Sequence, residues 1–224
     1  MAVVDSWVAY AGRCQRLFGV LLLGGCSLLA ACATRGSAQA PSGVIVSTVK
    51  VPAVAISTTG VQRVDDRVYW GGRPDAVLLK RLRALGVRTI VTFSEDASAL
   101  PAEKALAVAG GMDVVSIPVR VDREPSEEEV LLFLGTVLSP QRQPVYLHCD
   151  DGSDRTGAMV AMYRVVVSGW GIEDAFEEAK ASGFRLDRGG EALDRFVHQL
   201  KDHPQYFEWA RELASSTEDI AETP

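Results

Sequence analysis

The sequence has little positive charge for its length. Its 224 residues include 23 Lys and Arg against 29 Asp and Glu, and the formal net charge is −6. Nucleic-acid binding and adsorption to anionic lipid both depend on clustered Lys and Arg, so the composition disfavours both classes of partner. The hydrophobic content of 47% and charged content of 23% are typical of a soluble globular domain and exclude disorder, collagen and coiled coil for the whole chain.

Long apolar runs occur only near the N-terminus, where 18 uncharged residues lie between Arg16 and Arg35. A positive flank, an apolar run and then small residues are typical of a secretory signal. The run closes on Leu-Ala-Ala-Cys32, which resembles the lipobox of bacterial lipoproteins; Leu-Gly-Gly-Cys26 is a poorer copy. The resemblance implies a signal peptide at 1–32 and lipidation of Cys32. An uncleaved anchor is the alternative, because 18 helical residues nearly span a bilayer core of roughly 30 Å.

Either interpretation tethers the rest of the chain to a membrane outside the cytoplasm. Ala33 stands where Asp would retain a lipoprotein in the inner membrane, so the resemblance implies the outer membrane, facing the periplasm. Beyond residue 32 the chain has a single cysteine, Cys149, and no intrachain disulfide can form there. A free thiol is unusual in an oxidising compartment, which directs attention to the neighbours of Cys149.

The remaining sequence predicts a tether with a possible edge strand at 33–60, one domain at 61–214 and a flexible tail at 215–224. Strand and helix patterns alternate along the domain, which predicts an α/β fold with a central, mostly parallel sheet flanked by helices. Strands are expected at 61–64, 68–70, 87–93, 112–117 and 145–148, and helices at 74–85, 101–109, 126–138, 155–167, 172–181, 191–203 and 204–214.

The junction between the strand at 145–148 and the helix from 155 has the composition of an anion-binding loop. A loop at a helix N-terminus directs several backbone N–H groups into one concavity, and the helix dipole adds positive charge. Gly152 permits a turn that a β-carbon would obstruct, and Arg155 supplies a planar, two-pronged donor for phosphate oxygens. Cys149 is expected at the loop floor, where these groups favour the thiolate.

These residues resemble the HCxxGxxR[ST]G signature of the cysteine-based protein tyrosine and dual-specificity phosphatases. The matching positions are His148, Cys149, Gly152, Arg155, Thr156 and Gly157. Segments at 69–74, 86–91 and 117–118 are similar to small bacterial dual-specificity members, and the similarity extends from about Val64 to Phe196. Rhodaneses and arsenate reductases have related loops but lack the Thr-Gly ending.

The resemblance implies hydrolysis of a phosphomonoester in two steps, with neither metal nor other cofactor. Cys149 forms a phosphocysteine, which water then hydrolyses, while Arg155 and the loop amides hold the phosphoryl oxygens. Thr156 is expected to hydrogen-bond the sulfur. His148 is expected to orient the loop, unless it is merely structural. The phosphate-binding loop consists of Asp150, Asp151, Gly152, Ser153, Asp154 and Arg155.

The leaving oxygen needs a proton, and the resemblance implies an Asp on a separate loop. Asp122 is the candidate, because it follows the strand at 112–117 and precedes Cys149 by 27 residues, a gap that fits one crossover helix. Glu124 and Asp154 are its rivals, and an ordinary surface Asp is the alternative. Arg73 is a candidate contact for a substrate phosphate, and Arg185 and Arg188 are candidates for the rim of the pocket. A turn followed by a helix start explains the surroundings of Arg73 equally well, and none of the three is assigned a role.

The loop contains three acids, Asp150, Asp151 and Asp154, and no Lys. Relatives that act on densely phosphorylated inositides often carry Lys in this loop, so the expected substrate of the monomer is a phosphorylated protein or a phospholipid-like ester. The Asp151 and Asp154 pattern also resembles that of the myotubularins. A scavenging phosphatase for soluble inositol phosphates and a non-catalytic phosphate-binding module remain alternatives.

Overall fold

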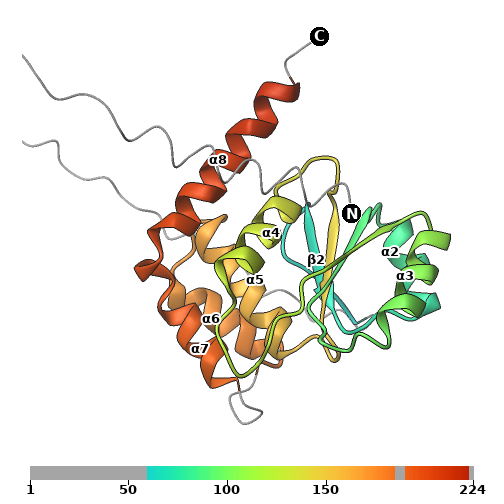
Figure 1. Cartoon of the computed structure of the whole chain (residues 1–224), viewed down its shortest axis with the longest axis horizontal. Helices are drawn as coiled ribbons and strands as arrows, with labels where there is room; N and C mark the ends of the chain where they lie inside the picture. Colours follow the sequence, from blue (N-terminus) through green and yellow to red (C-terminus); the bar gives the residue numbers. More distant parts are fainter. Residues whose placement is uncertain (1–59, 185–189, 222–224) are drawn as a thin grey trace, which may run out of the picture. The chain divides into compact units, whose positions relative to one another are not determined.

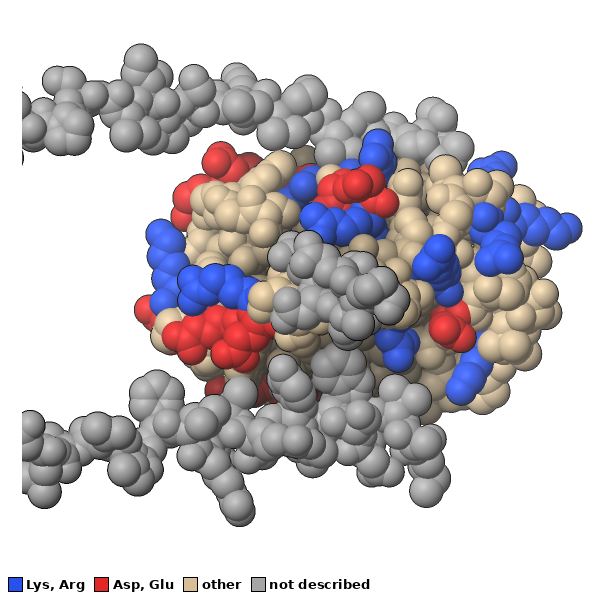
Figure 2. Space-filling model, turned by 90° about the horizontal axis from the view of Figure 1, so that it is seen from above, with Lys and Arg blue, Asp and Glu red and all other residues tan. Residues whose placement is uncertain are grey.

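The computed structural model describes residues 60–184 and 190–221 (Figure 1). The expected signal peptide with Cys32, the tether with its edge strand, and both Arg185 and Arg188 lie outside these residues. Within the two described ranges, no helix is both long and apolar enough to cross a membrane. On the face that Figure 2 shows, acidic and basic side chains lie interspersed.

A five-stranded sheet forms the centre of the domain, with the strand order β1-β2-β5-β3-β4. The first two strands are antiparallel, and every other neighbouring pair is parallel. The expected mostly parallel sheet is therefore confirmed, and each strand lies within two residues of its predicted range. The strands are β1 (Val61–Arg63), β2 (Val68–Gly71), β3 (Thr89–Thr92), β4 (Asp113–Ser116) and β5 (Val145–His148).

Helices cover both faces of the sheet, as the alternating pattern predicts (Figure 1). Successive residues of a strand point to opposite faces, so on β5 Tyr146 joins one apolar core and Leu147 the other. On the Tyr146 side lie α2 (Ala76–Ala84) and α3 (Leu100–Ala109); on the other side lie α4 (Glu127–Val137), α5 (Asp154–Val166), α6 (Ile172–Ala181), α7 (Glu191–His198) and α8 (Pro204–Ala221).

Local sequence signals account for several element boundaries. Asp75 caps α2 by accepting a hydrogen bond from the backbone N–H of Leu78, and Ser126 and Glu129 form the expected capping box of α4. Every residue of α5 except Arg155 is buried, which confirms that the helix with apolar residues on nearly all sides is central.

The C-terminal helices differ from the prediction. The segment expected as one helix at 191–203 divides into α7 and a 3₁₀ turn at Leu200–Asp202. The last helix was expected to end at residue 214, but α8 continues to Ala221, within the segment expected as a tail. Once a helix is nucleated by its packed part, each further residue adds one hydrogen bond at the cost of ordering one residue. Residues 222–224 lie outside the described residues.

Candidate active site

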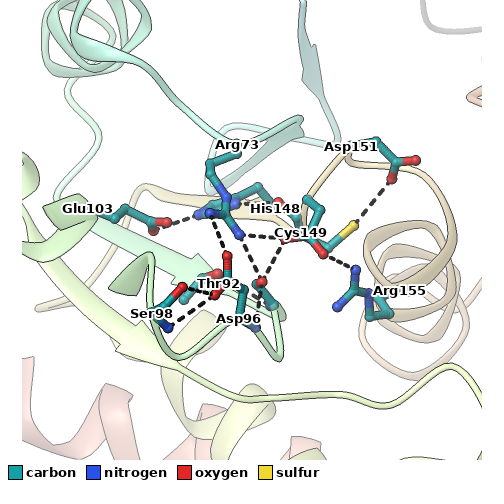
Figure 3. Close-up of polar contacts among 11 residues, drawn as sticks. Arg73, Thr92, Asp96, Ser98, Glu103, His148, Cys149, Asp151 and Arg155 are labelled. Atoms are coloured by element: carbon teal, nitrogen blue, oxygen red, sulfur yellow. Dashed lines mark hydrogen bonds and ion pairs between the residues drawn. The ribbon is translucent and has the colours of Figure 1, made fainter. Parts of the chain in front are cut away.

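The predicted phosphate-binding loop joins the carboxyl end of β5 to the N-terminus of α5. Ligands of α/β folds bind at this end of the parallel strands. Cys149 is completely buried at its start. The thiol lies 3.8 Å from Oδ1 of Asp151, and Figure 3 shows its sulfur directed toward that carboxylate. The same oxygen accepts hydrogen bonds from the backbone N–H and the hydroxyl of Ser153, at 3.2 and 2.7 Å.

The turn that follows β2 forms one wall of this loop. Gly152 has a φ of +78°, and a β-carbon there would lie 2.2 Å from the carbonyl oxygen of Gly71. A side chain on Gly71 would in turn lie 2.6 Å from the hydroxyl of Tyr146, which donates a 2.7 Å hydrogen bond to the carbonyl of Gly72. Glycine is therefore required on both sides of the contact, for its small size and, at Gly152, for its backbone conformation.

His148 contacts both the start of the phosphate-binding loop and α3, which lies on the opposite face of the sheet from α5. Its Nδ1 lies 2.7 Å from the carbonyl oxygen of Cys149 and its Nε2 lies 2.8 Å from Oε1 of Glu103. A carbonyl oxygen only accepts hydrogen bonds, so Nδ1 carries the hydrogen. Both side chains are buried. The contact agrees with a histidine that orients the start of the loop.

Glu103 is a residue that the sequence analysis missed. It lies on α3, and Glu103 and Ala107 are the buried residues of that helix. Their spacing of four places both on the inner face. An acid in register with a buried apolar residue was the available signal, but its partner His148 is 45 residues away in sequence.

Arg155 lies at the first turn of α5 and reaches back to the loop. Its Nη2 donates a 2.5 Å hydrogen bond to Oδ2 of Asp150, while Oδ1 of that carboxylate accepts from Nη2 of Arg73 and, at 2.6 Å, from the hydroxyl of Ser94. Burial favours the neutral acid, but the hydrogen bonds from Ser94 and Arg155 and the charges of both arginines outweigh it and lower the pKa of Asp150 to about 2. Asp150 is therefore ionised at neutral pH.

Thr156 is fully buried, and its hydroxyl has no hydrogen-bond partner among the described residues. The expected hydrogen bond to the sulfur of Cys149 is not formed in this structure, so that role stays a prediction. Asp154 is buried in the first turn of α5, where the helix dipole favours a negative charge.

Asp122 lies on the connection between β4 and α4, residues 117–126, which we call the acid loop. Its exposed carboxylate accepts two hydrogen bonds from Arg120, at 2.8 and 2.6 Å, and Arg120 also lies 3.6 Å from Glu95. The hydrogen bond from Arg120 lowers the pKa of Asp122. Among the described residues, Asp122 has no hydrogen bond or ion pair to the phosphate-binding loop. Its role as general acid stays a prediction, and it requires the carboxylate to leave Arg120.

The rival acids occupy different surroundings. Glu124 lies on the acid loop, with Oε1 3.9 Å from Nε of Arg195. Asp154 belongs to the phosphate-binding loop itself and is buried.

A cavity of about 100 Å³ lies beside the phosphate-binding loop, at the carboxyl ends of β3 and β4. Arg73, Ser94 and Glu103 belong both to its lining and to the contacts just described. Arg73 also lies 3.6 Å from Asp96, another lining residue. In the described part of the chain, no group of three or more His, Cys, Asp or Glu is placed to hold a metal ion.

Comparison with protein families matches residues 48–197 to the family described as a dual-specificity-type tyrosine phosphatase domain fused to NAD⁺ kinase. The chain belongs to this family. The match includes the whole signature from His148 to Gly157 and the segment at 64–196 in which the sequence resembles small bacterial phosphatases. The family and the α/β fold expected from the sequence are therefore both confirmed.

Individual relatives and a solved structure are also phosphatases by name or fold. The dual specificity protein phosphatase TpbA of Pseudomonas aeruginosa is 36% identical over 123 residues, 54% of each chain. The inositol diphosphatase DSP4 of Arabidopsis thaliana is 25% identical over 51% of this chain and 59% of its own. The chain thus spans just over half the length of these curated relatives. The crystal structure of P. aeruginosa TpbA in complex with pTyr has a TM-score of 0.57 and 27% identity, over 75% of this chain and 98% of that one.

Proposed function

We propose that this chain is a cysteine-dependent phosphatase that hydrolyses phosphomonoesters through a phosphocysteine intermediate. The observation that carries the proposal is the loop between β5 and α5, which places a buried Cys149 below a helix N-terminus and Arg155 at the beginning of that helix. A phosphoryl group needs an in-line nucleophile and fixed donors for its oxygens. The loop supplies both. The chain belongs to a phosphatase family and is similar to TpbA, and both findings support the same activity.

The reaction then proceeds in two balanced steps. The thiolate of Cys149 attacks phosphorus, the ester oxygen leaves with a proton from Asp122, and a phosphocysteine forms. Water next attacks the phosphorus, gives its proton to the carboxylate of Asp122, and the sulfur leaves as thiolate with release of phosphate. The hydroxyl of Thr156 is buried and without a partner among the described residues, so it is available to hydrogen-bond the departing sulfur.

Phosphotyrosine in proteins is the substrate that we favour. The TpbA structure in complex with pTyr is matched over 98% of the TpbA chain and 75% of this one. The phosphate-binding loop of this chain carries three acids and no Lys, which opposes a second or third phosphate close to the first. Phosphoinositide-like esters with few phosphates are the second candidate, and soluble inositol phosphates are the third, supported by the likeness to an inositol diphosphatase.

Phosphate release by the full chain tests the activity. The assay contains reductant and a chelator and compares a phosphotyrosine peptide, a monophosphorylated phosphoinositide and an inositol polyphosphate. We expect release from the peptide, and a loss of at least about 10⁴-fold in Cys149→Ser. Cys14→Ser is the matched control and should behave like the wild type. A chain that binds inorganic phosphate but releases none from any substrate would instead be a binding module.

We further propose that the domain is exported and anchored by a lipid on Cys32, in the outer membrane facing the periplasm. The support is the apolar run after Arg16 and its Leu-Ala-Ala-Cys ending. Incorporation of a labelled fatty acid tests it in Gram-negative cells: Cys32→Ala should lose the label, and Cys26→Ala should keep it. Equal labelling of both variants would contradict the lipid anchor.

A further inference from the structure

Two arginines from distant parts of the chain meet on one carboxylate of the phosphate-binding loop. Arg73 comes from the turn after β2 and Arg155 from α5, and Asp150 lies between them. Each carboxylate oxygen of Asp150 accepts from one of the two guanidinium groups, and Ser94 adds a third hydrogen bond. Figure 3 draws both arginines, with dashed lines that mark their contacts. The backbone N–H of Arg73 also donates to the carbonyl of Asp150, at 3.3 Å.

This arrangement determines which part of Arg155 is free. Its Nη2 is committed to Asp150, whereas Nε and Nη1 make no hydrogen bond to a described residue. A guanidinium group is planar and rigid, so one short hydrogen bond restricts the orientation of the whole group. Arg binds phosphate characteristically through two neighbouring N–H groups, either Nε with Nη2 or Nη1 with Nη2. Because Nη2 has two hydrogens and the contact with Asp150 uses one of them, one such pair of Arg155 remains for phosphate.

The charges explain why Arg73 is needed. Asp150 is ionised, and alone it would cancel the charge of Arg155 beside a site meant for an anion. With Arg73 the three groups carry one net positive charge. Arg73 also forms an ion pair with Asp96, whose carboxylate lies 3.6 Å away. The side chain of Arg73 is more exposed than that of Arg155, at 29% against 13%. The more exposed arginine, Arg73, neutralises the carboxylate that holds the less exposed Arg155.

We propose that Arg73 and Asp150 are positioning residues for the catalytic arginine: Arg73 and Ser94 hold the carboxylate of Asp150, and Asp150 orients Arg155 toward the phosphoryl group. This inference rests on the proposed phosphatase function. The opposite interpretation makes Asp150 a competitor that occupies Arg155 in place of the substrate. The two interpretations predict different kinetics when Asp150 is neutralised.

A double-mutant cycle distinguishes them. The variants are Arg73→Gln, Asp150→Asn and the two combined, with kcat and KM measured on an aryl phosphate and inhibition measured with inorganic phosphate. We expect each single variant to lose about tenfold in kcat, as for coupled neighbours. Arg73→Gln should have no further effect when Asp150→Asn is already present, because Arg73 acts through Asp150.

Two outcomes would overturn the proposal. In the first, Asp150→Asn keeps full kcat and binds inorganic phosphate more tightly, as a competitor would. In the second, the losses of the two variants multiply, as they would if Arg73 contacted the substrate directly. Arg81→Gln and Asp66→Asn are the matched controls, since neither side chain has a hydrogen bond or ion pair to a described residue. Urea unfolding is measured for every variant. Arg73→Gln and Asp150→Asn should have lower midpoints because they lose the contacts that depress the pKa of Asp150, but both should remain fully folded under the assay conditions, so that losses in kcat do not report unfolding.

Failure of the proposed function would be visible separately. If the wild type releases no phosphate, the same cycle is read as affinity for inorganic phosphate. Arg73→Gln should then weaken phosphate binding in the wild type but not in Asp150→Asn. A weakening of equal size in both backgrounds would contradict the positioning role even in a chain without activity.

Discussion

The phosphate-binding loop and the acid loop both follow the carboxyl ends of parallel strands, β5 and β4, but their key side chains are held very differently. The first begins with a fully buried Cys149 and is in contact through Gly152 with the turn after β2. The second carries an exposed Asp122 whose bonds go to Arg120, two residues away. The phosphate-binding loop is fixed by long-range contacts, whereas the hydrogen bonds of Asp122 itself are local.

The difference matches the work that each loop would do. Donors for a phosphoryl group are effective when they need no rearrangement during the reaction. A general acid must instead approach the leaving group, and catalytic hydrogen bonds are often formed only in the substrate complex. In the proposed reaction, Asp122 would have to leave Arg120 before it protonates the leaving oxygen.

The largest effect is expected when the contact at Gly152 is broken. In Gly152→Ala the new β-carbon would lie 2.2 Å from the oxygen of Gly71, so the loop must shift, and a shift of about 1 Å costs on the order of 100-fold in activity. Gly169→Ala is the control, because Gly169 has a similar φ of +73° and nothing within 4 Å. Both variants should lose about 1–2 kcal/mol of unfolding free energy from the left-handed backbone. Rates and urea unfolding are measured together; an active Gly152→Ala would show that the contact is dispensable.

Removal of the proposed acid comes next. Asp122→Asn should lower kcat by about 100-fold on an alkyl phosphate, whose leaving oxygen needs a proton. The loss should be much smaller on p-nitrophenyl phosphate, which leaves without one. Glu124→Gln, on the same loop, is the control and tests the rival acid. Near-full turnover of the alkyl ester by Asp122→Asn would disprove the assignment.

A smaller effect is expected from Arg120. Its hydrogen bond lowers the pKa of Asp122, so Arg120→Gln should raise that pKa. Because a general acid works only when protonated, the decline of kcat/KM at high pH should move to higher pH in the variant. Arg123→Gln should shift the profile less, since the charge of Arg123 is the smallest of the contributions to the pKa of Asp122. An unchanged profile would mean that Asp122 is not the titrating acid.

The smallest effect is expected at Tyr146, whose hydroxyl binds the turn that contacts the phosphate-binding loop. Tyr146→Phe removes the hydrogen bond to the carbonyl of Gly72 and should cost about 1 kcal/mol of unfolding free energy. Tyr69→Phe, its partner in register on β2, is the control, because the Tyr69 hydroxyl makes no hydrogen bond to a described residue. Urea denaturation measures both. Equal losses would show that the Gly72 contact contributes nothing specific.

Much of the fold was predictable because its signals are local. The capping box at Ser126 and the apolar α5 were expected from short patterns, and both are present. The end of α8 was placed too early, because the sequence around residue 214 contains no strong stop signal and the helix propagates beyond its packed part.

Parts of the site were not predictable for the converse reason. Glu103 meets His148 across 45 residues of sequence, and Arg73 meets Asp150 across 77. No local pattern marks such pairs, because an acid on a helix or an arginine in a turn is usually solvated. Only the packing of α3 and the β2 turn against the carboxyl ends of the strands brings them to the loop.

The sequence by itself determined the phosphatase signature, the nucleophile with its arginine and the order of strands and helices, because each depends on residues close together along the chain. The tertiary structure decided that Asp150 lies between two arginines, that Glu103 holds His148, and that Glu95 lies beside the Arg120 that binds Asp122. Those contacts depend on where the sheet places loops that are far apart in sequence, and charge and hydrogen bonding then select the partners.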